Sequence, residues 1–431
     1  MNPSTSSPPQ LNHFSVRFRH GAADYAGKIR LFSANARLYL GYTVLNGMAF
    51  GMFRLLFNFY ALSLGFNEAN LGQLLTVTNL VALLTALPAG LIGDRIGRKR
   101  TLILASLLTT TAVFGTVLWR ESMSFYLFSA VLGMGQSLAG VTLGPFIMEN
   151  SGEEERTYLF SFSFGIQMIA GFVGNWLGGH LPGWWGTAVN ADPSSATAYG
   201  LTMAVVGGIA ALSLIPLVFM RQPKQSGQEK QKQLSPLEYA RKKPRLLVKL
   251  ILPIFITSLG AGLLMPFMNV YYRHTYAASD GTIGTLFALG SLAMAIGLLS
   301  APPLAERYGK MKIVVVSQAL SIPFLALMGF APWFWLSAAA YLVRLMLMNM
   351  SNPVYQAFVM EQVDEDARAT VASLVSMSWN FGWAFSPTIS GWLQVNVGFG
   401  PVFIGTMLSY VVAIFLYWRF FGRAETKELH T

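Results

Sequence analysis

The hydrophobic residues of this 431-residue chain gather into twelve long runs separated by short polar segments. Each run approaches the roughly 20 residues that an α-helix needs to cross the hydrocarbon core of a bilayer. The pattern therefore predicts an all-α membrane protein with twelve transmembrane helices. The predicted spans cover residues 36–63, 70–93, 101–119, 124–148, 157–180, 198–220, 246–272, 281–304, 313–330, 333–359, 369–394 and 400–421.

A charged segment between the second and third runs has a partial copy further along the chain. Gly90–Arg100 reads Gly-Leu-Ile-Gly-Asp-Arg-Ile-Gly-Arg-Lys-Arg, and its copy occupies Ala305–Lys312, with Glu306 at the position of Asp94. The same offset, without a gap, pairs Glu149 with Glu361, Arg156 with Arg368, Ser161 with Ser373 and Gly179 with Gly391. A constant offset over so long a stretch indicates two parallel repeats. We therefore predict two six-helix halves, 36–220 and 246–421, joined by a polar linker, 221–245, and flanked by the segments 1–35 and 422–431.

Composition supports a membrane environment. Hydrophobic residues make up 53% of the chain and charged residues only 11%, with a mean hydropathy of +0.48. A soluble domain carries about a quarter charged residues. Cysteine is absent, which excludes disulfides and thiolate metal sites, and the five His residues show no metal-ligand spacing. We expect no metal, no cofactor and no enzymatic activity.

The net charge of +11 reflects topology, because the basic residues cluster in alternate loops. Only Arg120 and Arg273 fall outside this arrangement. An excess of Lys and Arg in cytoplasmic loops is the positive-inside pattern, so we predict that both termini are cytoplasmic and that nucleic acid is not a partner. Residues 1–35 lack the apolar core of a cleavable signal peptide. We expect a monomer in a bacterial cytoplasmic (inner) membrane, in contact with membrane lipids.

The segment Gly90–Arg100 resembles the loop 2–3 signature of the major facilitator superfamily, and the twelve-helix layout with a long central loop is similar over nearly the whole chain. The resemblance implies alternating access, with this loop acting as a latch between helices 2 and 11. Its glycines, Gly90, Gly93 and Gly97, would allow close helix approach. A simple topology anchor without a gating role is the alternative. The predicted gating residues are Gly90, Asp94, Arg95, Gly97, Arg98, Glu149, Arg156, Glu306, Arg307, Glu361 and Arg368.

Two arginines, Arg54 and Arg344, lie within the predicted lipid depth, where a charge is costly unless it faces a cavity or a partner. No Asp or Glu lies at comparable depth. A guanidinium stays protonated, so an anionic ligand held through its planar fork is one candidate partner; snorkelling or bonds to backbone near Pro266 and Pro353 are the other reading. Asn58 shares a stripe with Arg54, and Tyr341, Asn352 and Tyr355 share one with Arg344. The resemblance places helices 1, 4, 7 and 10 around a central cavity, and the predicted substrate-binding residues are Arg54, Asn58, Gln136, Asn269, Tyr341, Arg344, Asn352, Tyr355 and Asn380.

The favoured function is secondary transport of a small organic solute with an anionic or acidic head. A polyspecific exporter of drugs and lipophiles is the first alternative, because the 31 Phe, 20 Met and 10 Trp residues suit adaptable apolar pockets. A membrane sensor or scaffold that has lost transport is the second, because fold alone does not certify function. The intact segment Gly90–Arg100 argues against the sensor.

Overall fold

A computed structural model describes residues 32–151, 153–221, 239, 241–364 and 367–422, and every regular element in this part is helical. It confirms the all-α fold and the twelve spans. Most of the predicted terminal segments and linker lies outside the described residues. The N-terminal half contains α2 (Ala34–Ser63), α3 (Glu68–Ile96), α4 (Arg98–Leu118), α5 (Ser122–Glu149), α6 (Glu153–Val189), α7 (Ala196–Leu212) and its short extension α8 (Leu214–Phe219). The C-terminal half contains α10 (Pro244–Leu264), η1 (Met265–Phe267), α11 (Met268–Tyr276), α12 (Asp280–Tyr308), α13 (Lys310–Phe330), α14 (Phe334–Glu361), α15 (Arg368–Asn396) and α16 (Phe399–Phe421).

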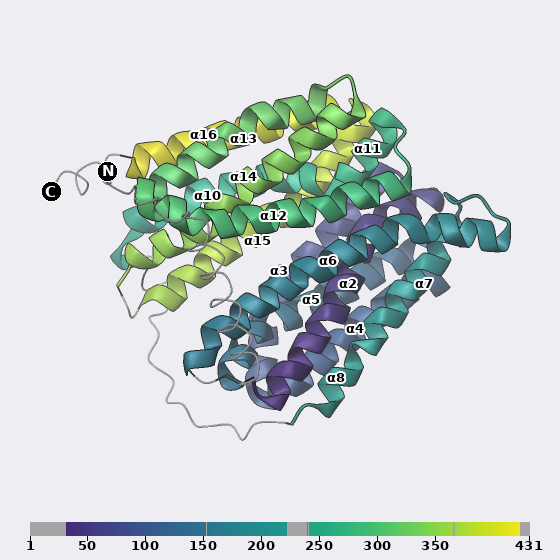
Figure 1. Cartoon of the computed structure of the whole chain (residues 1–431), viewed down its shortest axis with the longest axis horizontal. Coiled ribbons are helices and arrows are strands. Elements are labelled where there is room, and N and C mark those ends of the chain that lie inside the picture. The colour runs from purple at the N-terminus through teal and green to yellow at the C-terminus, as the bar shows by residue number, and fades with distance from the viewer. Residues whose placement is uncertain (1–31, 152, 222–238, 240, 365–366, 423–431) are drawn as a thin grey trace, which may run out of the picture.

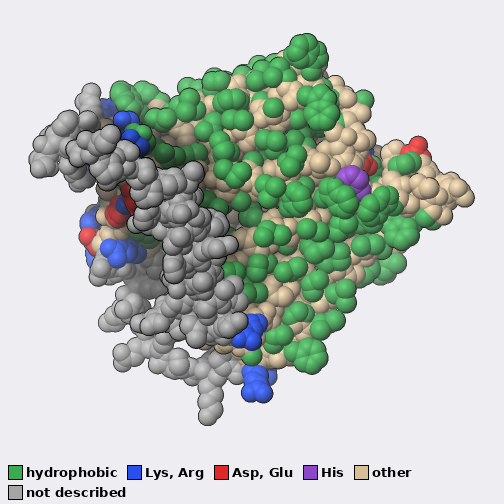
Figure 2. Space-filling view, in the orientation of Figure 1, with side chains coloured by type: hydrophobic (Ala, Val, Ile, Leu, Met, Phe, Trp, Pro, Cys, Tyr) green, Lys and Arg blue, Asp and Glu red, His purple; other side chains and the backbone are tan. Residues whose placement is uncertain are grey.

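The outer surface of the bundle is apolar. Large side chains such as Leu87 and Leu299 are 75% and 79% exposed, and Figure 2 shows hydrophobic side chains across the visible face, with Lys and Arg gathered toward one end. Nine spans of the described chain are long and apolar enough to cross a membrane. The other three, α6, α14 and α15, carry polar residues along their length, among them Gln167, Arg344 and Asn380.

The two halves repeat each other in detail. Shifting the bounds of α3, α4 and α5 by the offset between Asp94 and Glu306 gives the bounds of α12, α13 and α14. Gly97 and Gly309, with φ of 87° and 91°, precede α4 and α13 in the same left-handed backbone conformation, which glycine adopts without strain. The repeat is therefore structural as well as sequential.

The halves share one core at one end of the molecule and have separate cores at the other. We call the end with Gly97 and Gly309 the basic end, and the opposite end the far end. At the far end one hydrophobic cluster combines Phe59 and Tyr199 with Tyr272 and Phe403. Toward the basic end, one cluster lies wholly in the N-terminal half and another wholly in the C-terminal half. The two bundles accordingly lie closest at the far end and diverge toward the basic end (Figure 1).

Glycines line the two seams where the halves meet. In the seam between α3 and α15, a Cβ on Gly72 would clash with the carbonyl oxygen of Pro387. In the seam between α6 and α12, a Cβ on Gly179 would lie 2.5 Å from the carbonyl oxygen of Asp280 and 2.7 Å from the Cα of Gly284. Backbones approach this closely only where side chains are absent. The seams are equivalent in the repeat, because Gly284 is the counterpart of Gly72 at the repeat offset.

Candidate functional site

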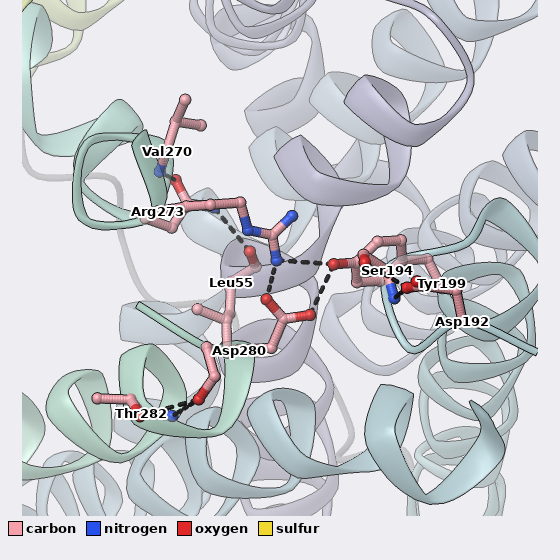
Figure 3. Close-up of polar contacts among 10 residues, drawn as sticks. Leu55, Asp192, Ser194, Tyr199, Val270, Arg273, Asp280 and Thr282 are labelled. Carbon is pink, nitrogen blue, oxygen red and sulfur yellow. Dashed lines mark hydrogen bonds and ion pairs between the residues drawn. The ribbon is translucent and has the colours of Figure 1, made fainter. Parts of the chain in front are cut away.

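A charged network joins the two halves at the far end. Arg273 of α11 forms an ion pair with Asp280, the first residue of α12, and donates a hydrogen bond of 2.7 Å to the Tyr199 hydroxyl of α7. That hydroxyl donates in turn to Asp280, at 2.6 Å. The guanidinium of Arg273 also lies 3.4 Å from the ring centroid of Phe59 on α2, a cation–π contact. Figure 3 shows the three polar groups converging on one another.

Local structure explains the position of each charge. Pro266 has no N–H, so the helix that includes α10 narrows to a 3-10 turn at Met265–Phe267 before α11 begins. Asp280 lies in the first turn of α12, where the helix dipole favours a carboxylate. Their side chains are 26% (Arg273) and 13% (Asp280) exposed. We call Arg273, Asp280, Tyr199 and Phe59 the far-end network; its members from α2 and α7 belong to one half and those from α11 and α12 to the other.

Asn58 and Asn269, two predicted substrate-binding residues, bond each other across the halves. The Asn58 amide donates to the Asn269 side-chain oxygen at 2.9 Å and to the carbonyl of Pro266 at 2.7 Å, and Asn269 donates back to the carbonyl of Leu55 at 2.7 Å. Both side chains are almost fully buried, at 2% and 1% exposure. In this conformation they close the far end beneath the far-end network.

Two weaker contacts also cross between the halves. Thr388 of α15 donates to Thr76 of α3 at 2.7 Å. His274 Nε2 lies 3.5 Å from a carboxylate oxygen of Glu68, a pair that is ionic only when the imidazole is protonated. Both contacts involve α3, so they hold the halves together beside the seam between α3 and α15.

The ion pairs that the structure describes at the basic end stay within one half. Arg98 pairs with Asp94 at 2.7 Å and with Glu149 at 3.3 Å, all in the N-terminal half. Lys310 pairs with Glu361 in the C-terminal half. Since Lys310 and Glu361 are the counterparts of Arg98 and Glu149 at the repeat offset, these two pairs are equivalent.

The remaining predicted gating residues are placed as follows. Gly93 lies against the Arg98 guanidinium, which a Cβ would approach to 2.8 Å, but nothing lies within 4 Å of a Cβ on Gly90. The prediction of close helix approach at Gly90 is wrong in this conformation, because that part of α3 faces open space. The side chain of Arg156 lies outside the described residues. Arg95, Glu306, Arg307 and Arg368 are exposed at the basic end, and Arg307 stacks 5.3 Å from the ring of Tyr308.

Arg54 lies one turn from Asn58, toward the basic end. Residues four positions apart on a helix point in directions that differ by only about 40°. Arg54 therefore faces the C-terminal half, as Asn58 does, but it lies nearer the basic end, where the halves have begun to separate. Its side chain is exposed, and the ion pairs among the described residues all involve other groups. An exposed guanidinium that takes part in none of the described ion pairs thus lies on the side of α2 that faces the C-terminal half.

Arg344 is placed differently, because it is buried inside the C-terminal half with 1% exposure. It donates to the Tyr410 hydroxyl of α16 at 3.0 Å and contacts the sulfur of Met265 at 3.5 Å, while its Nε has no partner among the described residues. The structure therefore does not bring Arg54 and Arg344 onto one open surface. Tyr341, one turn before Arg344 on α14, is 7% exposed and packs against the rings of Tyr272 and Phe287.

The other predicted binding residues separate into two groups. Tyr355 is 3% exposed, and its hydroxyl donates to the carbonyl of Leu250 within the basic-end core of the C-terminal half. The predicted place of Tyr355 in an open cavity is wrong for this conformation. The helical projection showed the direction in which the side chain points, but it could not show that other helices pack on that side. Asn352 and Asn380 are exposed. On α15, Asn380 points in a direction about 20° from that of Pro387, which contacts the N-terminal half, so Asn380 lies on the side of the helix that faces that half. Gln136 lines a cavity of about 270 Å³ within the N-terminal half.

Sequence reasoning missed the far-end network. One signal was available, since Arg273 is one of two basic residues that break the loop asymmetry. Tyr199 and Phe59 carried no signal, because each resembles an ordinary apolar position of a membrane helix.

Comparison with known proteins gives matches over most of the chain. A family described as Major Facilitator Superfamily matches residues 40–260 and 250–431. The chain is 26% identical over 332 residues to the tetracycline resistance protein, class C, of Escherichia coli, covering 71% of this chain and 76% of that protein. It is 24% identical over 340 residues to an uncharacterized MFS-type transporter of Enterobacter sp. (strain 638), covering 78% and 81%.

Solved structures share the fold. A mutant of the nucleoside transporter NupG superimposes with a TM-score of 0.72 at 16% identity, covering 90% of this chain and all of that one. A bacterial homolog of the human lysosomal transporter Spinster, in an inward-facing and occupied conformation, gives 0.70 at 15% identity, covering 89% and 95%.

Proposed function

Because this chain belongs to the Major Facilitator Superfamily, we propose that it carries a small organic solute with an anionic group across the membrane. The chain is a secondary transporter and not an enzyme. What we add is the charge of the solute and the residue that holds it.

The exposed guanidinium of Arg54 carries the proposal. It lies between the halves, close beneath the contacts of Asn58, and none of the described ion pairs includes it. Arginine cannot release its proton to escape a membrane environment. A carboxylate or phosphate would supply the missing charge through a bidentate contact. Arg344, whose polar partner in the described chain is the Tyr410 hydroxyl, also contacts Met265, the neighbour of the Pro266 that bonds Asn58, so it adds a second positive charge to the same region.

The positive-inside pattern supports a cytoplasmic basic end, and in that orientation this conformation is an inward-open state. The far-end network then closes the outer side of the transport path. Solute binding between the halves favours whichever state contacts it better, and the halves rock about the seams. Gradients of solute or ions supply the energy. The described chain places no carboxylate beside Arg54, and this favours exchange of anions or facilitated diffusion over a proton relay that depends on a carboxylate.

Thermal stabilisation of the purified protein by a panel of organic anions, neutral lipophiles and cationic drugs tests the proposal. We expect anions to stabilise the native protein and the Arg419→Ala control, whose side chain is exposed at the basic end. They should not stabilise Arg54→Ala, and Arg54→Lys should retain part of the effect because it keeps the charge without the planar fork. Equal stabilisation of Arg54→Ala by the anions would refute the proposed site.

Export of lipophilic compounds is a second candidate, favoured by the similarity to the tetracycline resistance protein. Under this reading neutral or anionic amphiphiles are the cargo, because the path lacks a described carboxylate that would attract cations. In the same panel, stabilisation by neutral lipophiles that persists in Arg54→Ala would favour export.

A further inference from the structure

A cavity of about 270 Å³, lined by apolar side chains and a group of polar ones, lies inside the N-terminal half, among α2, α4, α5, α6 and α7. Three carboxamides from three different helices line it: Asn46 of α2, Gln136 of α5 and Gln167 of α6. Ser106 and Thr109 of α4 add hydroxyl groups. Among the described residues, no Lys, Arg, Asp, Glu or His lines the cavity.

All three carboxamides at this cavity are half-buried. Within the described chain, no hydrogen bond involves the side chain of Asn46, Gln136 or Gln167. The Ser106 hydroxyl, in a residue only 5% exposed, faces the hydroxyl of Tyr42, which also lines the cavity. Polar groups at membrane depth are costly unless they bond to protein, water or a ligand. Their common direction toward one cavity indicates an occupant that bonds to them.

The chemistry of the lining defines the occupant. Each carboxamide offers two donors and an acceptor, and hydroxyls do both, so the matching group carries donors and acceptors of its own. A charged group would be buried here without a counter-ion, which is costly. The volume lies just below the roughly 300–1,000 Å³ of pockets for whole ligands. An uncharged amide, hydroxyl or heteroaromatic group of about one ring in size therefore fits.

The cavity adjoins Arg54 along α2. Phe50 and Phe53 line it, Phe50 is 48% exposed, and Arg54 directly follows Phe53. Asn46 lies eight residues before Arg54, about 12 Å along the helix axis at 1.5 Å per residue. One extended small molecule can span this distance.

We propose that this cavity is a subsite for the uncharged, hydrogen-bonding body of the solute whose anionic group Arg54 holds. The inference rests on the proposed function, and it narrows the substrate class to organic acids that carry an amide or similar neutral polar group. Carboxylates without such a group bind more weakly.

Two isosteric acids and one neutral amide provide the test. Hippurate and 4-phenylbutanoate share a ring and a carboxylate, and only hippurate has an amide between them; benzamide has the amide and no charge. We would measure binding of each by thermal shift and calorimetry to the full-length protein in nanodiscs. The native protein should favour hippurate about 5- to 10-fold over 4-phenylbutanoate, the difference that one good hydrogen bond makes.

Variants of the lining separate the possible results. Gln136→Leu and Gln167→Leu, on different helices, should each abolish the preference without lowering the melting temperature of the ligand-free protein, because they replace an unpaired amide by an apolar side chain. Gln362→Leu makes the same change at the exposed basic end of α14 and should retain the preference.

Each outcome decides between the two proposals. Equal binding of both acids, abolished by Arg54→Ala, would overturn the subsite and leave the anion site intact. Benzamide binding that depends on Gln136 while neither acid depends on Arg54 would support the subsite and overturn the anion site. Absence of binding by all three compounds would overturn the subsite, and the wider anion panel would then decide the anion site alone.

Discussion

Replacing Tyr199 by phenylalanine should open the far end of the protein. The hydroxyl of Tyr199 is the only part of the side chain that this change removes, and it contacts both Arg273 and Asp280 in the opposite half. The aromatic ring, which is fully buried, is retained. The substitution therefore weakens the closed far end with little effect on the packing of α7.

The size of the effect follows from the two bonds that are lost. Both are hydrogen bonds to charged groups, which contribute about 1.5–3 kcal/mol to stability. We assign that range to the two together, because the Arg273 side chain is 26% exposed and water replaces part of the interaction. A change of about 1.5–3 kcal/mol shifts the equilibrium between closed and open far ends by about 10- to 150-fold.

Distance measurements between spin labels can detect this shift. The chain has no cysteine, so labels can be attached to cysteines introduced at Ala188 and Val397, which are exposed at the far ends of α6 and α15. Tyr199→Phe should broaden the distance distribution toward longer values. Tyr60→Phe is the matched control, because its hydroxyl donates to the carbonyl of Thr116 within the N-terminal half. Identical distributions for Tyr199→Phe and the native protein would refute the role of the network.

Three further expectations concern the seams and the charges. Gly179→Ala should lengthen the same label distance, because the new Cβ meets the opposite half and overpacking costs about 1–3 kcal/mol. The control is Gly183→Ala, one turn further along α6, which should leave the distance unchanged because no described atom lies within 4 Å of its Cβ. Asp94→Asn should slow transport in proteoliposomes more than it weakens solute binding. The ion pair of Asp94 with Arg98 stabilises the present conformation by only about 0.3–0.5 kcal/mol, so its loss has little effect on binding. An unaltered transport rate would contradict the latch. Arg344→Met should leave the melting temperature unchanged or raise it, because a buried guanidinium with few partners is costly. Solute transport should fall. A lower melting temperature would assign Arg344 a structural role.

The hydrophobic pattern predicted the number of helices because lipid imposes a minimum length on every span. It predicted their ends less well. The run at 157–180 becomes α6, which continues to Val189, since Trp184 and Trp185 extend the helix beyond the predicted membrane boundary. At the start of α3 the structure begins at Glu68, where Asn67 and Asn70 form a capping box that hydropathy does not register.

The candidate site was predictable only in part, because charge at membrane depth is visible in a sequence and its partners are not. Arg54 and Arg344 stood out as isolated charges, yet one is exposed between the halves and the other is buried among side chains of its own half. Asn58 and Asn269 were recognised as polar positions in apolar helices. That they bond each other depends on how the two halves pack, a relation between residues 211 positions apart that no local pattern encodes.

The far-end contacts raise a question of energy balance that points back to the repeated loops. Eight hydrogen bonds cross between the halves in the described chain, at the far end and along the seams. The six bonds between neutral groups contribute about 0.6 kcal/mol each, the average found in a membrane protein, and the two bonds of Tyr199 contribute about 1.5–3 kcal/mol together. The total of about 5–7 kcal/mol is close to the roughly 5.5 kcal/mol that moves a two-state equilibrium from 1:99 to 99:1. A transporter must populate both states, so the opposite state needs new contacts of similar strength at the basic end. Arg98 and Lys310, which pair within their own halves here, lie where such contacts would form. We therefore expect charge substitutions at these two positions to stabilise the state described here, which is closed at the far end, and a label pair across the basic end to show it.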